Sequence, residues 1–134
     1  MLPASIEMQM LFCTMVLGLV QLTVAAFAAI AERGFKWTFG PRDVPAVPLG
    51  RVAGRLDRAW WNYLETFPIF AAAVLLCEVA GRHTAASAAG AQIFFWARVL
   101  YVPVYALGAP VLRTLVWTFC LLGIVMVLMA FWPG

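Results

Sequence analysis

Charged side chains are scarce in this sequence. Only 11% of its 134 residues are Asp, Glu, Lys or Arg, whereas 65% are hydrophobic. A soluble domain usually carries about 25% charged residues, so this composition excludes an ordinary water-soluble fold. It indicates instead that the chain resides in a lipid bilayer, and the length allows a single domain.

Cysteine and histidine are also few. The three cysteines are dispersed, no CxxC pair occurs, and His83 is the single histidine. A zinc site or a disulfide framework needs clusters or regular spacings of these residues, so the sequence favours neither and we expect no metal. Cys13, Cys77 and Cys120 are expected to be small buried residues within helices. His83 is expected to be solvated in a turn.

Long apolar tracts make up most of the chain. They predict four transmembrane helices, over residues about 5–32, 55–80, 84–108 and 110–132. Each tract is long enough to cross a hydrocarbon core of about 30 Å at about 1.5 Å per helical residue. The predicted fold is an all-α membrane protein, a four-transmembrane-helix bundle in which residues 1–134 form one domain. The first tract is too long for a signal peptide, so cleavage after it is not expected.

Basic residues are concentrated in one predicted connection. Six of the nine Lys and Arg residues lie between the first two helices: Arg33, Lys36, Arg42, Arg51, Arg55 and Arg58. Membrane proteins keep basic loops in the cytoplasm, so this connection is predicted to be cytoplasmic and both termini to lie outside. Topology and anionic membrane lipids explain the cluster, and no nucleic-acid partner is needed. The same connection is rich in Pro and Gly, which favours an ordered loop that either covers a site or serves only as a connector.

Polar residues interrupt the second apolar tract. Arg58, Asn62 and Glu65 are spaced i, i+4, i+7, so they share one face of a helix. If Glu78 marks the outer end of this helix, Glu65 lies roughly 10 Å inside the membrane from the cytoplasmic side. Charged groups at such depths are costly unless they meet polar partners.

The third and fourth tracts supply such partners. Arg98, Tyr101 and Tyr105 share one face of the third helix, with Arg98 roughly 15 Å from the same side, and Arg113 opens the fourth. These two polar helix faces and Arg113 therefore predict one pocket that opens toward the cytoplasm. Ionisable residues within a membrane usually serve a function. The alternative is that Glu65 and Arg98 form a buried ion pair that only fixes the helix register.

The residue types of this predicted pocket indicate the class of ligand. Arginines bind carboxylates, and a glutamate binds an amine or pairs with an arginine. A small zwitterion with additional carboxylates suits this set, and glutathione carries one amine, two carboxylates and a thiol. An apolar second substrate would arrive from the lipid.

The sequence resembles the MAPEG family, the membrane-associated proteins in eicosanoid and glutathione metabolism. The stretches "RAWWNYLETFPIF" and "FFWARVLYVPVYALGAPVLRTLVW" carry the resemblance, which covers nearly the whole chain, and "FGPRD" is similar to the bacterial branch. The resemblance implies a homotrimer of four-helix protomers in a bacterial inner membrane, with glutathione as co-substrate bound between subunits near the cytosolic face. It implies that Arg113 is catalytic, stabilising the thiolate, and that six residues bind glutathione: Arg58, Asn62, Glu65, Arg98, Tyr101 and Tyr105.

Family resemblance also implies a function, a membrane-bound glutathione S-transferase or peroxidase acting on hydrophobic electrophiles or lipid hydroperoxides. The alternative is a non-catalytic MAPEG-type protein that binds lipid or assists another membrane protein. A small multidrug transporter is the third candidate, but such transporters depend on an acidic residue in the first helix, and residues 8–31 contain none. Three positions depart from the family pattern. Glu32 stands at the end of the first helix, where several mammalian members have a basic residue. When the sequence is aligned at Tyr105, Leu112 falls at the position of the family's catalytic arginine, and Arg113 fits that position only with a shift of one residue. Thr66 follows Glu65, where some relatives have tyrosine.

Overall fold

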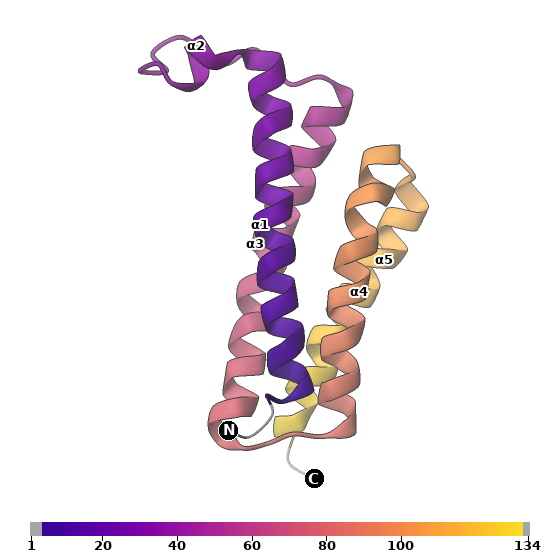
Figure 1. Ribbon diagram of the computed structural model, residues 1–134. Coiled ribbons are helices and arrows are strands. Elements are labelled where there is room, and N and C mark those ends of the chain that lie inside the picture. The colour runs from indigo at the N-terminus through magenta and orange to yellow at the C-terminus, as the bar shows by residue number, and fades with distance from the viewer. Residues whose placement is uncertain (1–3, 133–134) are drawn as a thin grey trace.

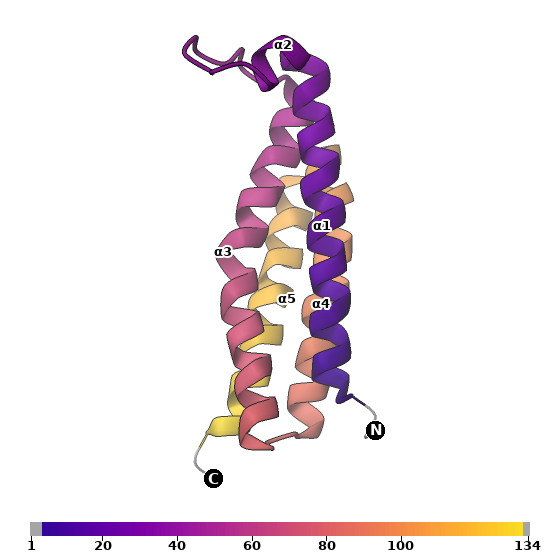
Figure 2. The ribbon, with the colours of Figure 1, turned by 60° about the vertical axis from the view of Figure 1, so that its left-hand side comes forward.

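The computed structural model describes residues 4–132, and four long helices account for most of them. The helices run up and down side by side (Figures 1 and 2): α1 (Ile6–Arg33), α3 (Arg51–Ala80), α4 (Ala85–Leu107) and α5 (Pro110–Leu128). All four are long and apolar enough to cross a membrane. The described residues form no strand. The predicted all-α, four-helix membrane fold is confirmed.

Two short elements complete the chain. Helix α2 (Phe35–Thr38) lies in the connection between α1 and α3, and the 3₁₀ turn η1 (Met129–Phe131) follows α5. Helix α3 begins at Arg51, earlier than the sequence indicated. The physical reason is that Pro48 is the last proline of the connection, and an isolated glycine such as Gly54 is tolerated within a helix.

The connection between α1 and α3 is held by its own contacts. Trp37 of α2 lies between the guanidinium groups of Arg33 and Arg42, 5.1 and 5.3 Å from its ring centre. Its indole N–H donates to the carbonyl of Val44 over 3.0 Å. The backbone N–H of Gly50 donates to the Glu32 carboxylate, which fixes the start of α3 beside the end of α1.

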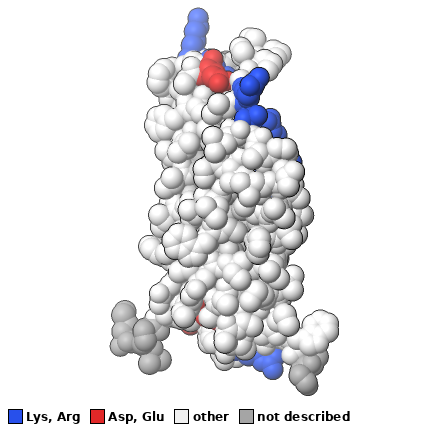
Figure 3. Space-filling model, turned by 90° about the vertical axis from the view of Figure 1, so that its right-hand side faces the viewer, with Lys and Arg blue, Asp and Glu red and all other residues white. Residues whose placement is uncertain are grey.

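Charged groups gather at the two ends of the bundle. Figure 3 shows this for one face, where an uncharged band separates the basic and acidic side chains at either end. We call the end that carries α2 the α2 end; both ends of the described chain lie at the opposite end (Figure 1). The uncharged band is the part expected to contact lipid, since many of its large apolar side chains are exposed.

A polar cluster ties the helices together at the opposite end. Buried Glu7 of α1 accepts a hydrogen bond from the Ser87 hydroxyl of α4 over 2.5 Å. His83 is exposed, as expected of a turn residue, but its Nδ1 also lies 3.4 Å from Glu7, and its Nε2 lies 3.7 Å from Glu78. The buried carboxylate therefore meets polar partners from two elements, which limits the cost of its burial.

Small residues allow α4 and α5 to pack closely. Gly90 of α4 faces Gly123 of α5, and a Cβ added at Gly90 would lie 2.6 Å from the carbonyl oxygen of Gly123. The stretch "AASAAGA" could serve packing within one bundle or between subunits on sequence grounds. In the structure, Gly90 of this stretch serves packing within the bundle.

Replacement of Gly123 by valine is expected to destabilise the protein by about 1–3 kcal/mol. A Cβ at this position would lie 2.7 Å from the carbonyl oxygen of Gly90 and 2.8 Å from the backbone nitrogen of Phe94, so the helices must move apart. Thermal unfolding in detergent measures the loss. Leu122→Val, on the exposed side of α5, is the control and should change little. An unaltered melting temperature for Gly123→Val would show that α4 and α5 do not pack this way.

Candidate functional site

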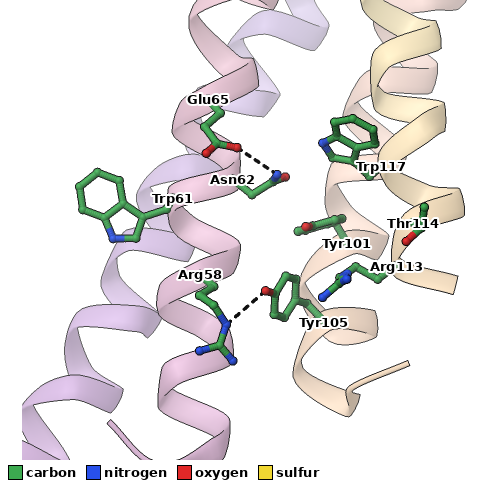
Figure 4. Close-up of a pocket in the computed structure, with 9 residues that line it drawn as sticks. All are labelled: Arg58, Trp61, Asn62, Glu65, Tyr101, Tyr105, Arg113, Thr114 and Trp117. Atoms are coloured by element: carbon green, nitrogen blue, oxygen red, sulfur yellow. Dashed lines mark hydrogen bonds between the residues drawn. The ribbon is translucent and has the colours of Figure 1, made fainter. Parts of the chain in front are cut away.

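A cleft of about 520 Å³ lies between α3, α4 and α5, in the half of the bundle nearer the α2 end (Figure 4). This volume falls within the range of about 300–1,000 Å³ that is usual for small-molecule sites. Six of the seven predicted site residues line it. The complete lining is Arg58, Trp61, Asn62, Glu65, Tyr101, Tyr105, Arg113, Thr114 and Trp117.

The seventh predicted residue, Arg98, lies behind the cleft wall and not on it. Its side chain is fully buried, and it donates hydrogen bonds to Asn62 Oδ1 over 2.9 Å and to the hydroxyl of Thr66. The guanidinium also lies 5.1 Å from the ring centre of Tyr101 and 5.5 Å from that of Phe94. Arg98 therefore orients Asn62 from within the bundle, and Thr66, the departure from the family pattern, is its second side-chain partner.

Asn62 connects the buried arginine to the carboxylate of the cleft. Its Oδ1 accepts from Arg98, and its Nδ2 donates to Glu65 over 3.3 Å (Figure 4). An asparagine suits this position because its amide carries both an acceptor and two donors. No ion pair joins Glu65 to Arg98 in the described structure. The hypothesis of a direct ion pair is therefore wrong, because Asn62 stands between the two charges.

Glu65 is available to a ligand. The side chain is exposed, and within residues 4–132 only one of its oxygens accepts a hydrogen bond. The other oxygen can accept from an amine or an N–H group bound in the cleft.

Two arginines flank one tyrosine at the mouth of the cleft. Arg58 donates from Nε to the Tyr105 hydroxyl over 3.3 Å, and the Arg113 guanidinium lies 5.1 Å from the centre of the same ring (Figure 4). Between residues 4 and 132, neither arginine forms a salt bridge with a carboxylate. The mouth thus presents positive charge that the described part of the chain does not neutralise, and such a mouth attracts anions.

The local backbone explains why Arg113 reaches this mouth. Gly108 ends α4 with a positive φ of 77°, a conformation that glycine adopts readily, and Pro110 begins α5 two residues later. This tight turn places the first turn of α5 beside Tyr105. Leu112 is exposed and does not line the cleft, whereas Arg113 does. Arg113 rather than Leu112 therefore reaches the cleft.

Sequence reasoning missed four members of the site. Trp61, Thr114 and Trp117 line the cleft. Arg55 lines an adjoining cavity of about 180 Å³ that shares Arg58, Tyr105 and Arg113 with the cleft. The sequence assigned Arg55 only to the basic connection, although its spacing of i−3 from Arg58 places both on one face of α3.

The cleft offers cations, hydroxyl groups and one carboxylate. The nine lining residues include no cysteine or histidine, and residues 4–132 contain no cluster of His, Cys, Asp and Glu fit to hold a metal ion. This arrangement can bind a multiply charged ligand and stabilise negative charge on it. A nucleophile would come from the ligand.

Comparison with known proteins gives one match. A family model described as the MAPEG family matches residues 10–132. No curated protein and no solved structure matches the chain significantly.

Proposed function

The chain belongs to the MAPEG family of membrane proteins of eicosanoid and glutathione metabolism, and on this premise we propose that it is a membrane-bound glutathione S-transferase or peroxidase. Its substrates are hydrophobic electrophiles or lipid hydroperoxides that enter from the bilayer. The observation that carries the proposal is the arginine pair at the cleft mouth, which lacks a carboxylate partner among the described residues.

The charges of the cleft complement those of glutathione. The glycine carboxylate at one end of the tripeptide suits Arg58 at the mouth and Arg55 in the adjoining cavity, and the amine at the other end, which shares its carbon with the second carboxylate, suits Glu65. Glu65 and Arg58 are seven residues apart on α3, about 10 Å along the helix. An extended tripeptide spans roughly 10 Å, so one molecule can reach both. In this arrangement Tyr101 and Tyr105 line the middle of the ligand from α4.

Arg113 is assigned to the thiol. A free thiol has a pKa of about 8.5 and is mostly protonated at neutral pH, whereas a nearby guanidinium favours the thiolate, which is the nucleophile. In conjugation, the thiolate attacks an electrophilic carbon, a C–S bond forms, and the leaving group departs with the bonding electrons. In peroxide reduction, the thiolate attacks a peroxide oxygen and an alcohol leaves. A second glutathione then converts the oxidised sulfur to the disulfide, and water is released.

The proposal includes the assembly and its orientation. We place the protein in a bacterial inner membrane as a homotrimer, with glutathione held between neighbouring subunits and the α2 end in the cytoplasm. Two observations support this orientation: the basic residues at the α2 end, and the position of the cleft in the half of the bundle nearer that end.

The test is glutathione binding and turnover by the protein purified in detergent. We expect calorimetry to show binding, ultraviolet difference spectroscopy to show a thiolate band, and an aryl halide to be conjugated. Absence of binding would overturn the proposal. Binding without a thiolate band, conjugation or hydroperoxide reduction would instead identify the protein as the non-catalytic alternative, a lipid-binding or accessory member of the family.

A further inference from the structure

A second cavity lies on the other side of the contact between α3 and α4. It has a volume of about 230 Å³, is bounded by α1, α3 and α4, and shares no lining residue with the cleft of Figure 4. Eight of its nine lining residues are apolar, and the ninth is Gln21 of α1. The proposed glutathione chemistry makes no use of this cavity.

Gln21 is a buried amide without a partner. Its side chain is 7% exposed, and neither its nitrogen nor its oxygen forms a hydrogen bond with the described residues. Buried polar groups are paired in the great majority of cases, so an unpaired amide that lines a cavity points to a ligand. Gln21 is twelve residues from Arg33, about 18 Å along α1, which places it near the middle of the membrane span.

A backbone carbonyl adds to the hydrogen-bonding capacity of this cavity. Pro103 lies within α4 and has no N–H, so the carbonyl of Val99 lacks its α-helical donor. Both residues line the cavity, together with Gln21. The residues that line the cavity therefore include one with an unpaired amide and one whose carbonyl lacks its helical donor.

We propose that this cavity binds an apolar molecule that carries one neutral hydroxyl group, with the hydroxyl hydrogen-bonded to Gln21. A hydroxyl both donates and accepts, as the amide does. A phosphate or carboxylate headgroup does not fit, because the cost of a charge is highest at the bilayer centre. The volume suffices, since an apolar cavity of about 150 Å³ accommodates benzene.

The surroundings favour a lipid-borne ligand over water or a second copy of the chain. Water enters a cavity stably when it finds two to four polar partners, and most of this lining offers none. Val20 and Val24 also line the cavity and are exposed, so it is open toward the lipid. A helix of a neighbouring subunit would lie over these two valines, whereas Gln21 is turned inward between α3 and α4.

Photolabelling tests this proposal. The probe is a medium-chain alcohol with a diazirine on its chain, used with the detergent-purified protein in the absence of glutathione. Mass spectrometry should locate saturable labelling on residues of the cavity, such as Leu17 and Val102. An unlabelled alcohol should compete about tenfold better than the alkane of the same length, because only the alcohol forms the hydrogen bond.

Gln21→Leu should abolish the tenfold preference for the alcohol while leaving the protein folded. Gln92→Leu, which replaces an exposed glutamine of α4, is the matched control and should retain the preference. Circular dichroism and glutathione binding report whether each variant is folded.

Three results would overturn the proposal. They are labelling confined to other surfaces, equal competition by alcohol and alkane in the unmodified protein, and dissociation of the oligomer in Gln21→Leu. The last would show that Gln21 pairs with a neighbouring subunit. Because labelling needs no glutathione, these results leave the proposed transferase activity untouched.

Discussion

Replacement of Arg113 by alanine is expected to lower the thiolate fraction of bound glutathione about 25-fold at pH 7. If the guanidinium lowers the thiol pKa by about two units, from about 8.5 to about 6.5, the thiolate fraction is about three quarters with Arg113 and about three per cent without it. Such a shift corresponds to about 2.7 kcal/mol. The guanidinium is free to act on the thiol because it lies against the Tyr105 ring and forms no salt bridge with a described carboxylate.

The pH profile of conjugation distinguishes this role from simple binding. The reactive form is the thiolate, so the rate should rise with pH through about 6.5 in the unmodified protein and through about 8.5 in Arg113→Ala. At pH well above 9 the two proteins should converge. Arg113→Lys retains a positive charge and should fall between them. Arg82→Ala, at the opposite end of the bundle, is the matched control. An unshifted profile in Arg113→Ala would remove Arg113 from the mechanism.

Asn62→Leu is expected to be the most destabilising single change in the cleft, with a loss of about 3 kcal/mol or more. Arg98 is fully buried, and Asn62 Oδ1 is one of its two side-chain acceptors. Leucine would leave this buried cation with Thr66 as its remaining side-chain acceptor. Unfolding of the detergent-solubilised protein, followed by circular dichroism, measures the free energy lost.

Asn62→Asp separates stability from binding. Aspartate still accepts from Arg98, so the free energy of unfolding should stay close to that of the unmodified protein. It also adds a negative charge beside Glu65, which should weaken the binding of anionic glutathione in calorimetry. Thr114→Val is the control for the cleft surface, since within residues 4–132 the Thr114 hydroxyl donates only to the carbonyl of Pro110 in its own helix. Equal stability of Asn62→Leu and Asn62→Asp would show that Asn62 does not support Arg98.

Much of the site could be predicted because helical periodicity is regular. Arg58, Asn62 and Glu65 fall on one face of any straight helix, and this face does line the cleft. The role of Arg98 could not be predicted in this way. Periodicity places Arg98 on the same helix face as Tyr101 and Tyr105, but this face is wide. The packing of α3 against α4 decides that Arg98 is buried behind Asn62.

The amino-acid sequence alone is enough to predict four apolar helices that cross a membrane, the segment that carries most of the basic charge, and the polar residues that share a helix face. These properties depend on local composition and on spacing along one helix, so they do not require knowledge of how the helices pack. The packing of the helices was needed to show that Asn62 separates Arg98 from Glu65, that Arg113 rather than Leu112 reaches the cleft, and that Gln21 lines an apolar cavity. Each of these depends on the rotation of one helix against another. A rotation of this kind is set by residues distant in sequence, such as Gly90 and Gly123, which let the two helix backbones approach closely, and hydrophobic periodicity does not specify it.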